Sequence, residues 1–497
     1  MDKRPLVALV SLPSRAYSSV LPMSYMYLAA WLEKKGIASE IIDIKKIRYP
    51  GDTAVAGTDE TVEKILAIIE EKRPEYVGFT CYTADLNSLM QISRLIKGRI
   101  KTTIIAGGIH PTLKPEDILF DGSPVDVAAI GEGENTLYEL VENDTKGGTL
   151  DAVAGIAYRK GGVVVRTGER PYMKDLGELP MPAYDKIDMD FYSTPQQSMV
   201  RHLFLSGVRI FTARGCPYLC TFCANRDQKV RYRPVKSVIE ELAFLKREYD
   251  IDGFYINDDT FCMDRRRTFE FLDKFEERKL GMVWGVETRA NLLDEEMIVR
   301  LKKAGCIQVD IGVESGSQEM LDRVKKGIKV EDAVRTFDLC RRHKIRTFAC
   351  FMVNMPGETE RHIDASIALM KRIRSTVYGI NITIPYIGTR IYEEYVKPPL
   401  RPDEYGIFSF TNSFRPLRDG RFRLVSHSLN EKRIYYLRFK RFKFFRSIMD
   451  ITFDPLYWGM IFRSSRKVLY LKQFFRATVY RLFMYPVKLF RTVNFKP

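Results

Sequence analysis

Three cysteines in one short segment carry the strongest chemical signal in this sequence of 497 residues. Cys216, Cys220 and Cys223 have the spacing C-x3-C-x2-C, and no fourth cysteine follows nearby. Thiolates hold iron–sulfur clusters, and a four-iron cube normally takes four of them. The spacing therefore predicts a [4Fe-4S] cluster with one iron left open to another molecule. The alternatives are three unrelated cysteines or a zinc knuckle, although zinc sites close with four ligands.

The composition suits a globular protein of two or three domains in a reducing compartment. Hydrophobic residues make up 45% of the chain and aromatic residues 12%, which is enough for large buried cores. The other five cysteines are scattered without a disulfide-like framework, which favours the cytoplasm. The apolar run at residues 6–13 is too short for a signal peptide. No uncharged apolar stretch of about 18 residues occurs, so we expect no membrane-spanning helix.

Residues 1–148 alternate short apolar runs with helical segments. The apolar runs are continuous, as in parallel strands that are covered on both faces. The pattern predicts an α/β domain with a doubly wound, Rossmann-like parallel sheet and ligand sites at the carboxyl ends of its strands. The expected strands are 6–12, 38–44, 76–81, 103–107 and 125–130, with helices at 24–35, 60–71, 87–97 and 134–143. Residues 149–200, which contain a hairpin-like stretch and a proline-rich run, are interpreted as a linker.

A second alternating series fills residues 201–398. It predicts six βα units, which form a partial (β/α)6 TIM-like barrel with its chemistry at the carboxyl ends of the strands. The expected strands are 208–213, 253–257, 283–287, 308–313, 347–353 and 378–384. The expected helices are 235–249, 266–278, 295–304, 330–343 and 359–373.

Polar and turn-forming residues stand where four of these barrel strands end. They are Asp258 with Asp259, Glu287 with Arg289, Glu314 with Ser315, and Pro356 with Gly357. Carboxylates at such positions suit an ammonium group through charge-assisted hydrogen bonds. Structural alternatives remain open: Asp caps helices well, and Glu287 and Arg289 have the charges of an ion pair.

The cysteine spacing and these strand-end motifs resemble the radical S-adenosylmethionine (radical SAM) enzymes. The resemblance implies that the open iron takes the amino and carboxylate groups of SAM, and that an electron donor such as flavodoxin or ferredoxin drives its cleavage to a 5′-deoxyadenosyl radical. The implied SAM-binding residues are Asp258, Asp259, Glu287, Glu314, Ser315, Pro356 and Gly357. The chain departs from the family pattern at Asn354, where related chains carry Gly, and at Ile387, which replaces a proline. Phe222 either shields the cluster or belongs to the barrel core.

The N-terminal domain resembles the cobalamin-binding domain that precedes the barrel in one large radical SAM subgroup. The matching segments are 22–30, 80–83, 106–112 and 131–134. Glycines after a strand let the backbone approach a flat ligand or a phosphate. The resemblance therefore implies cobalamin contacts at Gly107, Gly108, Gly131 and Gly133, with His110 as a further candidate. Because the Asp-x-His-x-x-Gly pattern is absent, His110 is interpreted as a structural turn residue, and cobalt is expected to lack a protein histidine.

Residues 399–497 form a basic, aromatic-rich extension that is expected to be mainly helical. From residue 432 onward, 16 Lys and Arg stand against two acids, so this stretch carries +14 of the net charge of +16. Basic and aromatic side chains suit a helix on an anionic membrane, helices packed on the barrel with a solvated basic face, or an RNA backbone. The dense apolar content favours lipid over nucleic acid. The expected location is the cytoplasm, with the extension at the inner face of the membrane.

The resemblance implies a cobalamin-dependent methyltransferase that acts on an unactivated carbon of a hydrophobic substrate, for which a lipid is one choice. The alternatives are a radical cyclase or rearrangement enzyme, a tRNA-modifying enzyme that uses the basic extension, and a non-catalytic cobalamin or cluster sensor. The motifs at successive strand ends argue against the sensor, because a sensor has no need of a complete SAM site.

Overall fold

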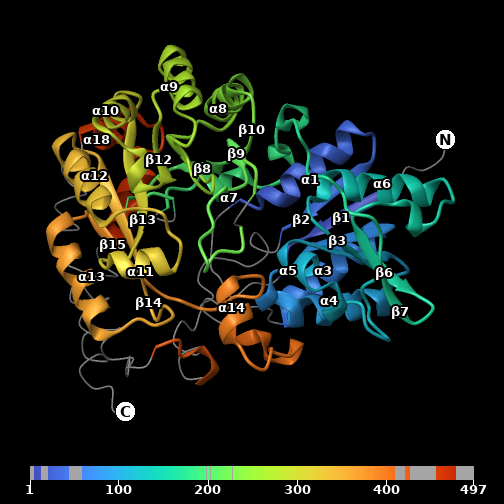
Figure 1. Ribbon diagram of the computed structural model, residues 1–497. Coiled ribbons are helices and arrows are strands. Elements are labelled where there is room, and N and C mark those ends of the chain that lie inside the picture. The colour runs from blue at the N-terminus through green and yellow to red at the C-terminus, as the bar shows by residue number, and fades with distance from the viewer. Residues whose placement is uncertain are drawn as a thin grey trace. The chain divides into compact units, whose positions relative to one another are not determined.

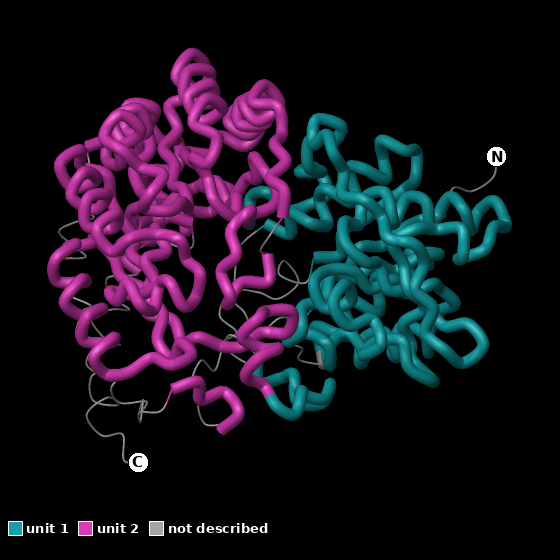
Figure 2. The backbone as a smooth tube through the Cα atoms, viewed as in Figure 1, with its two compact units in different colours: residues 1–191, 397–415 teal, residues 192–396, 416–497 magenta. Residues whose placement is uncertain are grey.

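The computed structural model describes residues 5–12, 21–43, 59–196, 199–201, 203–225, 228–408, 420–425 and 455–476. The chain divides into two compact units (Figure 2). The first contains residues 1–191 and 397–415, and the second contains residues 192–396 and 416–497. A seven-stranded sheet lies in the first unit and a six-stranded sheet in the second (Figure 1).

The sheet of the first unit has the strand order β2-β1-β3-β4-β5-β6-β7. Its strands are β1 Leu6–Val10, β2 Ala38–Ile42, β3 Tyr76–Thr80, β4 Thr103–Gly107, β5 Val127–Ala129, β6 Ile156–Lys160 and β7 Val163–Arg166. Strands β1 to β5 pair in parallel, and the order reverses direction between β1 and β3. This order confirms the predicted doubly wound α/β sheet, in which ligands bind near the reversal.

A hairpin formed by β6 and β7 extends this sheet with antiparallel pairing. It lies within residues 149–200. The turn consists of Gly161 and Gly162, whose φ angles of 59° and 86° suit a two-residue hairpin turn. The sequence indicated the hairpin, but not that β6 would pair with β5.

The helices of the first unit pack on this sheet through apolar faces. They are α1 Met23–Lys34, α3 Asp59–Lys72, α4 Leu86–Arg99, α5 Ile109–Leu113 and α6 Gly133–Thr145. Val7, Leu9 and Val127 of the sheet share one buried cluster with Ala29 of α1 and Leu140 of α6. The short helices η1 Thr83–Asp85 and η7 Pro402–Phe408 also belong to this unit. Helix α7, Met189–Ser193, lies where the chain passes from the first unit to the second.

The sheet of the second unit is entirely parallel, in the order β15-β14-β13-β12-β11-β8. Its strands are β8 Gly207–Ile210, β11 Gly253–Ile256, β12 Val283–Thr288, β13 Cys306–Glu314, β14 Arg346–Val353 and β15 Val377–Ile382. Strands that are sequential in the chain are neighbours in space, which confirms the predicted partial barrel. A separate two-stranded pair is formed by β9 Ala213–Arg214 and β10 Arg231–Tyr232.

Helices follow the barrel strands, and the longer ones lie along the outer side of this sheet (Figure 1). They are α8 Val235–Tyr249, α9 Arg265–Arg278, α10 Glu295–Lys303, α11 Gln318–Arg323, α12 Val330–Arg342, α13 Glu360–Ile373 and α14 Arg390–Tyr395. Asp264 and Asp294 cap α9 and α10 by accepting hydrogen bonds from the first-turn amides of Arg267 and Met297. Trp284 is buried beneath α9, with its ring 5.9 Å from that of Phe271.

Two helical segments of the C-terminal extension pack near the amino ends of the barrel strands. They are α18, Pro455–Arg463, and residues 467–476. Tyr457 and Tyr470 are fully buried in a cluster with Val283 and Ile307, which stand near the beginnings of β12 and β13. Among the described residues, no helix is long and apolar enough to cross a bilayer.

Candidate active site

The three cysteines occupy one loop whose two ends are paired. Strand β9 leads into the loop and β10 leads out of it, with Arg214 opposite Arg231 and Ala213 opposite Tyr232. Inside, the amide of Gln228 donates to the carbonyl of Cys216 over 2.8 Å. Cys220 is buried, Cys216 and Cys223 are half-buried, and all three thiols are free. The loop therefore returns to its starting strand and keeps the three thiols within one closed segment.

Asp258, at the end of β11, braces the entrance of this loop. Its Oδ1 accepts hydrogen bonds from the amides of Thr212 at 2.6 Å and Ala213 at 3.1 Å, and its Oδ2 accepts one from the Thr212 hydroxyl. Burial raises the pKa of Asp258 to about 6. Both oxygens of this carboxylate thus position the strand before the cysteines. Its predicted contact with SAM stays a prediction.

The neighbouring Asp259 is exposed and stands on the cysteine-loop side. Its Oδ1 accepts a hydrogen bond of 3.3 Å from the side-chain amide of Asn225, two residues after Cys223. Although its side chain is exposed, the surrounding protein removes part of its hydration, and this desolvation raises the pKa of Asp259. Of the two consecutive aspartates, Asp259 therefore has a carboxylate open to a ligand beside the cysteines.

Arg289 joins the end of β12 to the cysteine loop. Its Nη1 lies 3.9 Å from the Sγ of Cys220, and its guanidinium stacks 3.6 Å from the ring centroid of Tyr218. The same buried side chain donates to the carbonyl of Lys326. In the described part of the chain Arg289 forms no ion pair with Glu287, so its charge faces the cysteine that lies deepest.

Glu314 and Lys326 form a buried ion pair next to the same loop. The Nζ of Lys326 lies 2.7 Å from Oε1 of Glu314, and both side chains are less than a tenth exposed. Burial lowers the pKa of Lys326, but the charges of Glu314 and Cys220 outweigh it and raise that pKa overall. The ammonium also lies 5.9 Å from the ring centroid of Phe222, the residue before Cys223. Glu314 has a φ of 61°, so the chain bends sharply at the end of β13.

Glu287 stands on the face of the sheet that carries Asp310. The two residues are opposite each other in the register of β12 and β13. The Glu287 side chain is exposed at the surface of the site. Desolvation by the surrounding protein and the charges of Asp310 and Glu314 nevertheless raise the pKa of Glu287 to about 7. Such a carboxyl is present in both protonation states near neutral pH and can donate or accept a hydrogen bond.

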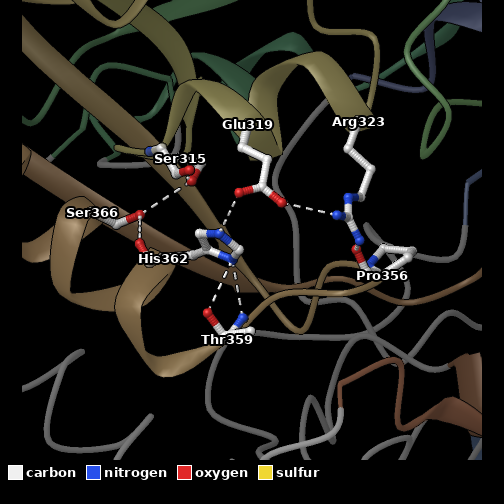
Figure 3. A network of polar contacts seen from close by, with 8 residues as sticks. Ser315, Glu319, Arg323, Pro356, Thr359, His362 and Ser366 are labelled. Atoms are coloured by element: carbon white, nitrogen blue, oxygen red, sulfur yellow. Dashed lines mark hydrogen bonds and ion pairs between the residues drawn. The ribbon is translucent and has the colours of Figure 1, made fainter.

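Ser315 belongs to a polar network that links α11 and α13 (Figure 3). Its Oγ lies 3.3 Å from the Oγ of Ser366, which also accepts from the amide of Gly316 at 2.9 Å. Ser315 is fully buried. On the far side of the network Arg323 donates to the carbonyl of Pro356 over 3.5 Å. The network fixes both residues, and their predicted contacts with SAM stay predictions.

Asn354 and Gly357 connect the end of β14 to residues 420–425. The buried Asn354 side chain donates to the carbonyls of Thr383 and Phe422 at 3.1 and 2.8 Å and accepts from the amide of Leu424 at 3.2 Å. The amide of Gly357 donates to the carbonyl of Leu424 over 3.2 Å. Asn354 has a φ of 67°, a conformation that Asn tolerates. This explains how Asn occupies a position where related chains carry Gly.

In the first unit, two glycine turns meet at the carboxyl ends of β4 and β5. Gly108 has a φ of 96°, and a Cβ there would come within 3.0 Å of Thr80 and 3.1 Å of the Cys81 carbonyl. Gly131 has a φ of 79° and faces open space. The hydroxyl of Thr112 donates to the Gly108 carbonyl at 2.8 Å and accepts from the Gly131 amide at 3.0 Å. The structure therefore brings these two predicted glycines together.

The other two predicted glycines stand at the same end of the sheet. Gly107 ends β4, where a Cβ would lie 3.6 Å from the Cβ of Ala129. Gly133 begins α6, where a Cβ would lie 3.1 Å from Leu28 of α1. These glycines permit close packing of the elements that carry the turns.

His110 is completely enclosed in the first unit. Its ring lies edge-on to Tyr405 with a centroid distance of 5.4 Å, and its Nε2 lies 3.7 Å from Oδ2 of Asp117. Neither ring nitrogen has a hydrogen-bond partner among the described residues. Burial, reinforced by the charge of Lys114, lowers the pKa of His110 to about 4. The imidazole is therefore neutral and packed as a core side chain.

Each of the two units matches a known protein family. Residues 210–370 match the radical SAM superfamily, and residues 14–141 match the B12 binding domain. Over 339 residues the chain is 30% identical to an uncharacterized methyltransferase of Pyrococcus horikoshii, which covers 67% of this chain and 72% of that protein. The chain belongs to the B12-binding radical SAM enzyme family.

This radical SAM enzyme has one further relative with a named activity and one solved structure that shares its fold. It is 27% identical to the anaerobic magnesium-protoporphyrin IX monomethyl ester cyclase of Rubrivivax gelatinosus, over 77% of this chain and 70% of that one. The structure of TsrM, a radical S-adenosylmethionine methyltransferase of Kitasatospora setae with cobalamin and a [4Fe-4S] cluster bound, superposes with a TM-score of 0.64 at 21% identity. That match covers 80% of this chain and 75% of TsrM, and it shows a shared fold.

The surroundings of the cysteines in this radical SAM enzyme fit an anionic cluster. Arg289 and Lys326 bring positive charge to Cys220, and nearby cations stabilise thiolates. Within the described ranges, no three His, Cys, Asp or Glu side chains converge closely enough to hold a single ion. Each thiolate of a four-iron cube binds a different iron, so the sulfurs need not converge on one point. Enzymes of this family use a [4Fe-4S] cluster, SAM and cobalamin, and they need a reductant.

Sequence reasoning missed Lys326 in this radical SAM enzyme. The residue lies in Lys-Lys-Gly between α11 and α12, and it is separated from Glu314 by 12 positions. No helical or strand period relates two residues at that separation across a loop. The sequence signal for a turn next to the lysine was Gly327. In the structure this glycine has a φ of 66°.

Proposed function

We propose that this enzyme is a cobalamin-dependent radical SAM methyltransferase acting on an unactivated carbon of a hydrophobic substrate. One observation carries the proposal: the closed cysteine loop, the Arg289 guanidinium and the buried Glu314–Lys326 pair stand together at the carboxyl ends of parallel strands. When bound, the cluster with SAM supplies one-electron chemistry at carbon, and cobalamin supplies a methyl group. The methyltransferase name of the relative from Pyrococcus horikoshii supports the outcome.

The cysteine loop would hold the cluster through Cys216, Cys220 and Cys223. Arg289 is fixed by its stacking on Tyr218 and its hydrogen bond to the Lys326 carbonyl, so its charge stays beside the deepest thiolate. Partial neutralisation of the cluster by a fixed cation eases the arrival of a further electron.

The strand ends would bind SAM by charge and by backbone shape. Asp259 and Glu287 are exposed carboxyls that can accept from the SAM ammonium, whereas Asp258 holds the strand beneath them. Glu314, held by Lys326 through Oε1, would accept a hydrogen bond from a ribose hydroxyl at its other oxygen. We assign Ser315, Pro356 and Gly357 to the wall around the nucleoside.

The glycine turns at Gly108 and Gly131 would admit cobalamin to the edge of the first sheet, because neither turn carries a side chain. Gly107 lets β4 pack closely on β5, and Gly133 lets α6 pack closely on α1, so both support the two turns. His110 stays in the core in this proposal, so cobalt receives no ligand from it.

Apolar side chains at the barrel support a hydrophobic substrate. Phe222 and Met352 are partly exposed and pack against the buried Met320, Val324 and Met355. They flank the cysteine loop and the end of β14. Radical cyclisation is the second candidate, because one relative at 27% identity is named as a cyclase.

The test begins with the anaerobically purified, reconstituted protein and added cobalamin. We expect about four irons and about one corrin per chain, with iron lost in the Cys220→Ala variant and corrin retained. Cells supplied with methyl-labelled methionine are then extracted, and mass spectrometry locates the label. A labelled methyl group in an apolar compound that depends on Cys220 supports methylation. Product formation without label, or a protein that retains no corrin, contradicts it and leaves cyclisation.

A further inference from the structure

The described part of the C-terminal extension is firmly held by the barrel through one face. The Tyr470 hydroxyl donates to Oδ2 of Asp252 at 2.9 Å and accepts from the amide of Ser206 at 2.8 Å. Ser464 donates to the same carboxylate oxygen over 2.7 Å. Arg466 donates to the carbonyls of Ser193 and Tyr249 at 3.0 and 2.9 Å. These buried contacts fix the orientation of residues 455–476, so the opposite face always points away from the barrel.

That opposite face is apolar along its centre. The large apolar side chains that are exposed in this segment are Phe462 on α18, at 74%, and Val468, Leu471 and Phe475 on the following helix, at 70%, 59% and 74%. Val468, Leu471 and Phe475 are three and four positions apart, so they form one stripe along the helix of residues 467–476. Large side chains exposed together in this way mark an interaction surface.

The flanks of the stripe are basic. Residues 455–476 contain five Arg and Lys and no acid. Arg466 is used internally, and the other four are exposed: Arg463, Lys467, Lys472 and Arg476. By helical spacing, Lys467 lies on one side of the stripe, and Lys472 and Arg476 lie on the other. An apolar stripe between two basic margins is complementary to a bilayer with anionic head groups, into which the apolar residues insert.

We infer that residues 455–476 form a docking surface for an anionic lipid bilayer, with Val468, Leu471 and Phe475 inserted between the head groups. The charge pattern favours this occupant over another protein, because both margins carry the same sign. RNA would use the basic residues and would stack on Phe475, but it would leave Val468 and Leu471 without a role. Docking would hold the barrel at a surface where apolar molecules are concentrated. The inference itself does not depend on which reaction the enzyme performs.

The full-length protein is mixed with vesicles of phosphatidylcholine alone or with phosphatidylglycerol, and binding is measured by co-sedimentation without turnover. We expect binding to the anionic vesicles only. The Leu471→Ser/Phe475→Ser variant should raise the lipid concentration for half-binding about tenfold or more, because it removes most of the inserted apolar area. The Lys467→Gln/Lys472→Gln variant should raise it about fivefold for each charge.

Control variants change one exposed apolar residue and one exposed lysine elsewhere on the surface. Val163→Ser alters a side chain on β7 that is 63% exposed, and Lys236→Gln alters an exposed lysine of α8. Both should bind vesicles as the unaltered protein does. The inference is overturned if the unaltered protein ignores anionic vesicles, or if the controls weaken binding as much as the stripe variants. Salt-sensitive retention on RNA that survives Leu471→Ser/Phe475→Ser, or dimerisation that this variant abolishes, would also overturn it.

Discussion

Lys326 balances the charge of Glu314, whose carboxylate is almost completely buried. Removing one member of a buried pair leaves the other uncompensated, which costs about 3–5 kcal/mol. We expect Lys326→Met to lower the free energy of unfolding by about 3 kcal/mol in urea denaturation, because Glu314 stays buried. The double variant with Glu314→Gln should recover most of this loss.

The adjacent Lys325 provides the control. Its side chain is exposed and its φ of 52° is equally compatible with Met, so Lys325→Met should change stability by less than about 0.5 kcal/mol. Equal losses from the two substitutions would mean that the pair with Glu314 contributes nothing.

Glu358 makes stability depend on pH in a direction opposite to that of most carboxylates. Burial raises its pKa to about 7, from an ordinary value of 4.5. The folded chain therefore binds the proton more tightly than the unfolded chain, and the stabilisation is complete below pH 4.5 and lost as the pH rises to about 7. We expect Glu358→Gln, which can still accept from the Asn354 amide, to be more stable than the unaltered protein at pH 8.

The gain should be on the order of 3 kcal/mol at pH 8 and should shrink progressively toward pH 5. Unfolding measured at several values across this range tests it, with Glu360→Gln on the exposed first turn of α13 as the control. A difference between Glu358→Gln and the unaltered protein that is constant with pH would show that the carboxyl titrates normally.

At the scale of elements, the turn after β4 should tolerate a side chain less well than the turn after β5. An Ala at either Gly108 or Gly131 must adopt a positive φ, at about 1–3 kcal/mol, and Gly108, with a φ of 96° and a ψ of −168°, lies in a region that is essentially restricted to Gly. At Gly108 the added Cβ also presses on Thr80 and the Cys81 carbonyl, and overpacking costs about 1–3 kcal/mol more. We expect Gly108→Ala to destabilise the cobalamin-free protein clearly more than Gly131→Ala does, measured by thermal unfolding. Equal losses would mean that neither the contacts of the added Cβ nor the more restricted backbone at Gly108 matters.

The sequence predicted the elements well where one period governs a whole segment. Continuous apolar runs such as residues 76–80 indicated buried parallel strands, and the alternation of runs with helices indicated both sheets. It could not predict α11 as a separate helix, because six residues carry too little periodicity. Nor could it show that β6 would pair with β5, since that pairing depends on the geometry of the sheet edge.

The site was predictable only as far as its residues are local in the chain. The cysteine spacing and the strand-end carboxyls are local patterns. The support given by Asp258 to Thr212 and by Lys326 to Glu314 depends on contacts between separate elements. Asp258 and Asp259 are adjacent with similar side chains, and only the structure separates the buried brace from the exposed carboxylate.

At the scale of the whole molecule, the last described segment reinforces the amino ends of the barrel strands. Tyr470 makes two buried hydrogen bonds with its hydroxyl, one of them to the Asp252 carboxylate, and the Tyr457 hydroxyl donates to the neutral Phe204 carbonyl over 2.8 Å. Removing the Tyr470 hydroxyl leaves a buried amide and part of a carboxylate unsatisfied, at about 1–3 kcal/mol for each group. We expect Tyr470→Phe to destabilise the barrel more than Tyr457→Phe in urea unfolding, because Tyr470 donates to a carboxylate and Tyr457 to a neutral carbonyl.

Limited proteolysis provides an independent measurement. If Tyr470 couples the segment to the barrel, Tyr470→Phe should speed cleavage within residues 455–476 more than Tyr457→Phe does. Identical cleavage rates for the two variants would argue that the apolar cluster alone holds the segment.

The paired ends of the cysteine loop have a consequence for damage and repair. The bonds between β9 and β10, and those from Asp258 to Thr212 and Ala213, involve no iron. If oxygen destroys the cluster, the cysteine loop should therefore remain folded. Iron, sulfide and a reductant would suffice to refill it, without unfolding and resynthesis of the chain, so oxidative inactivation of this enzyme is expected to be reversible.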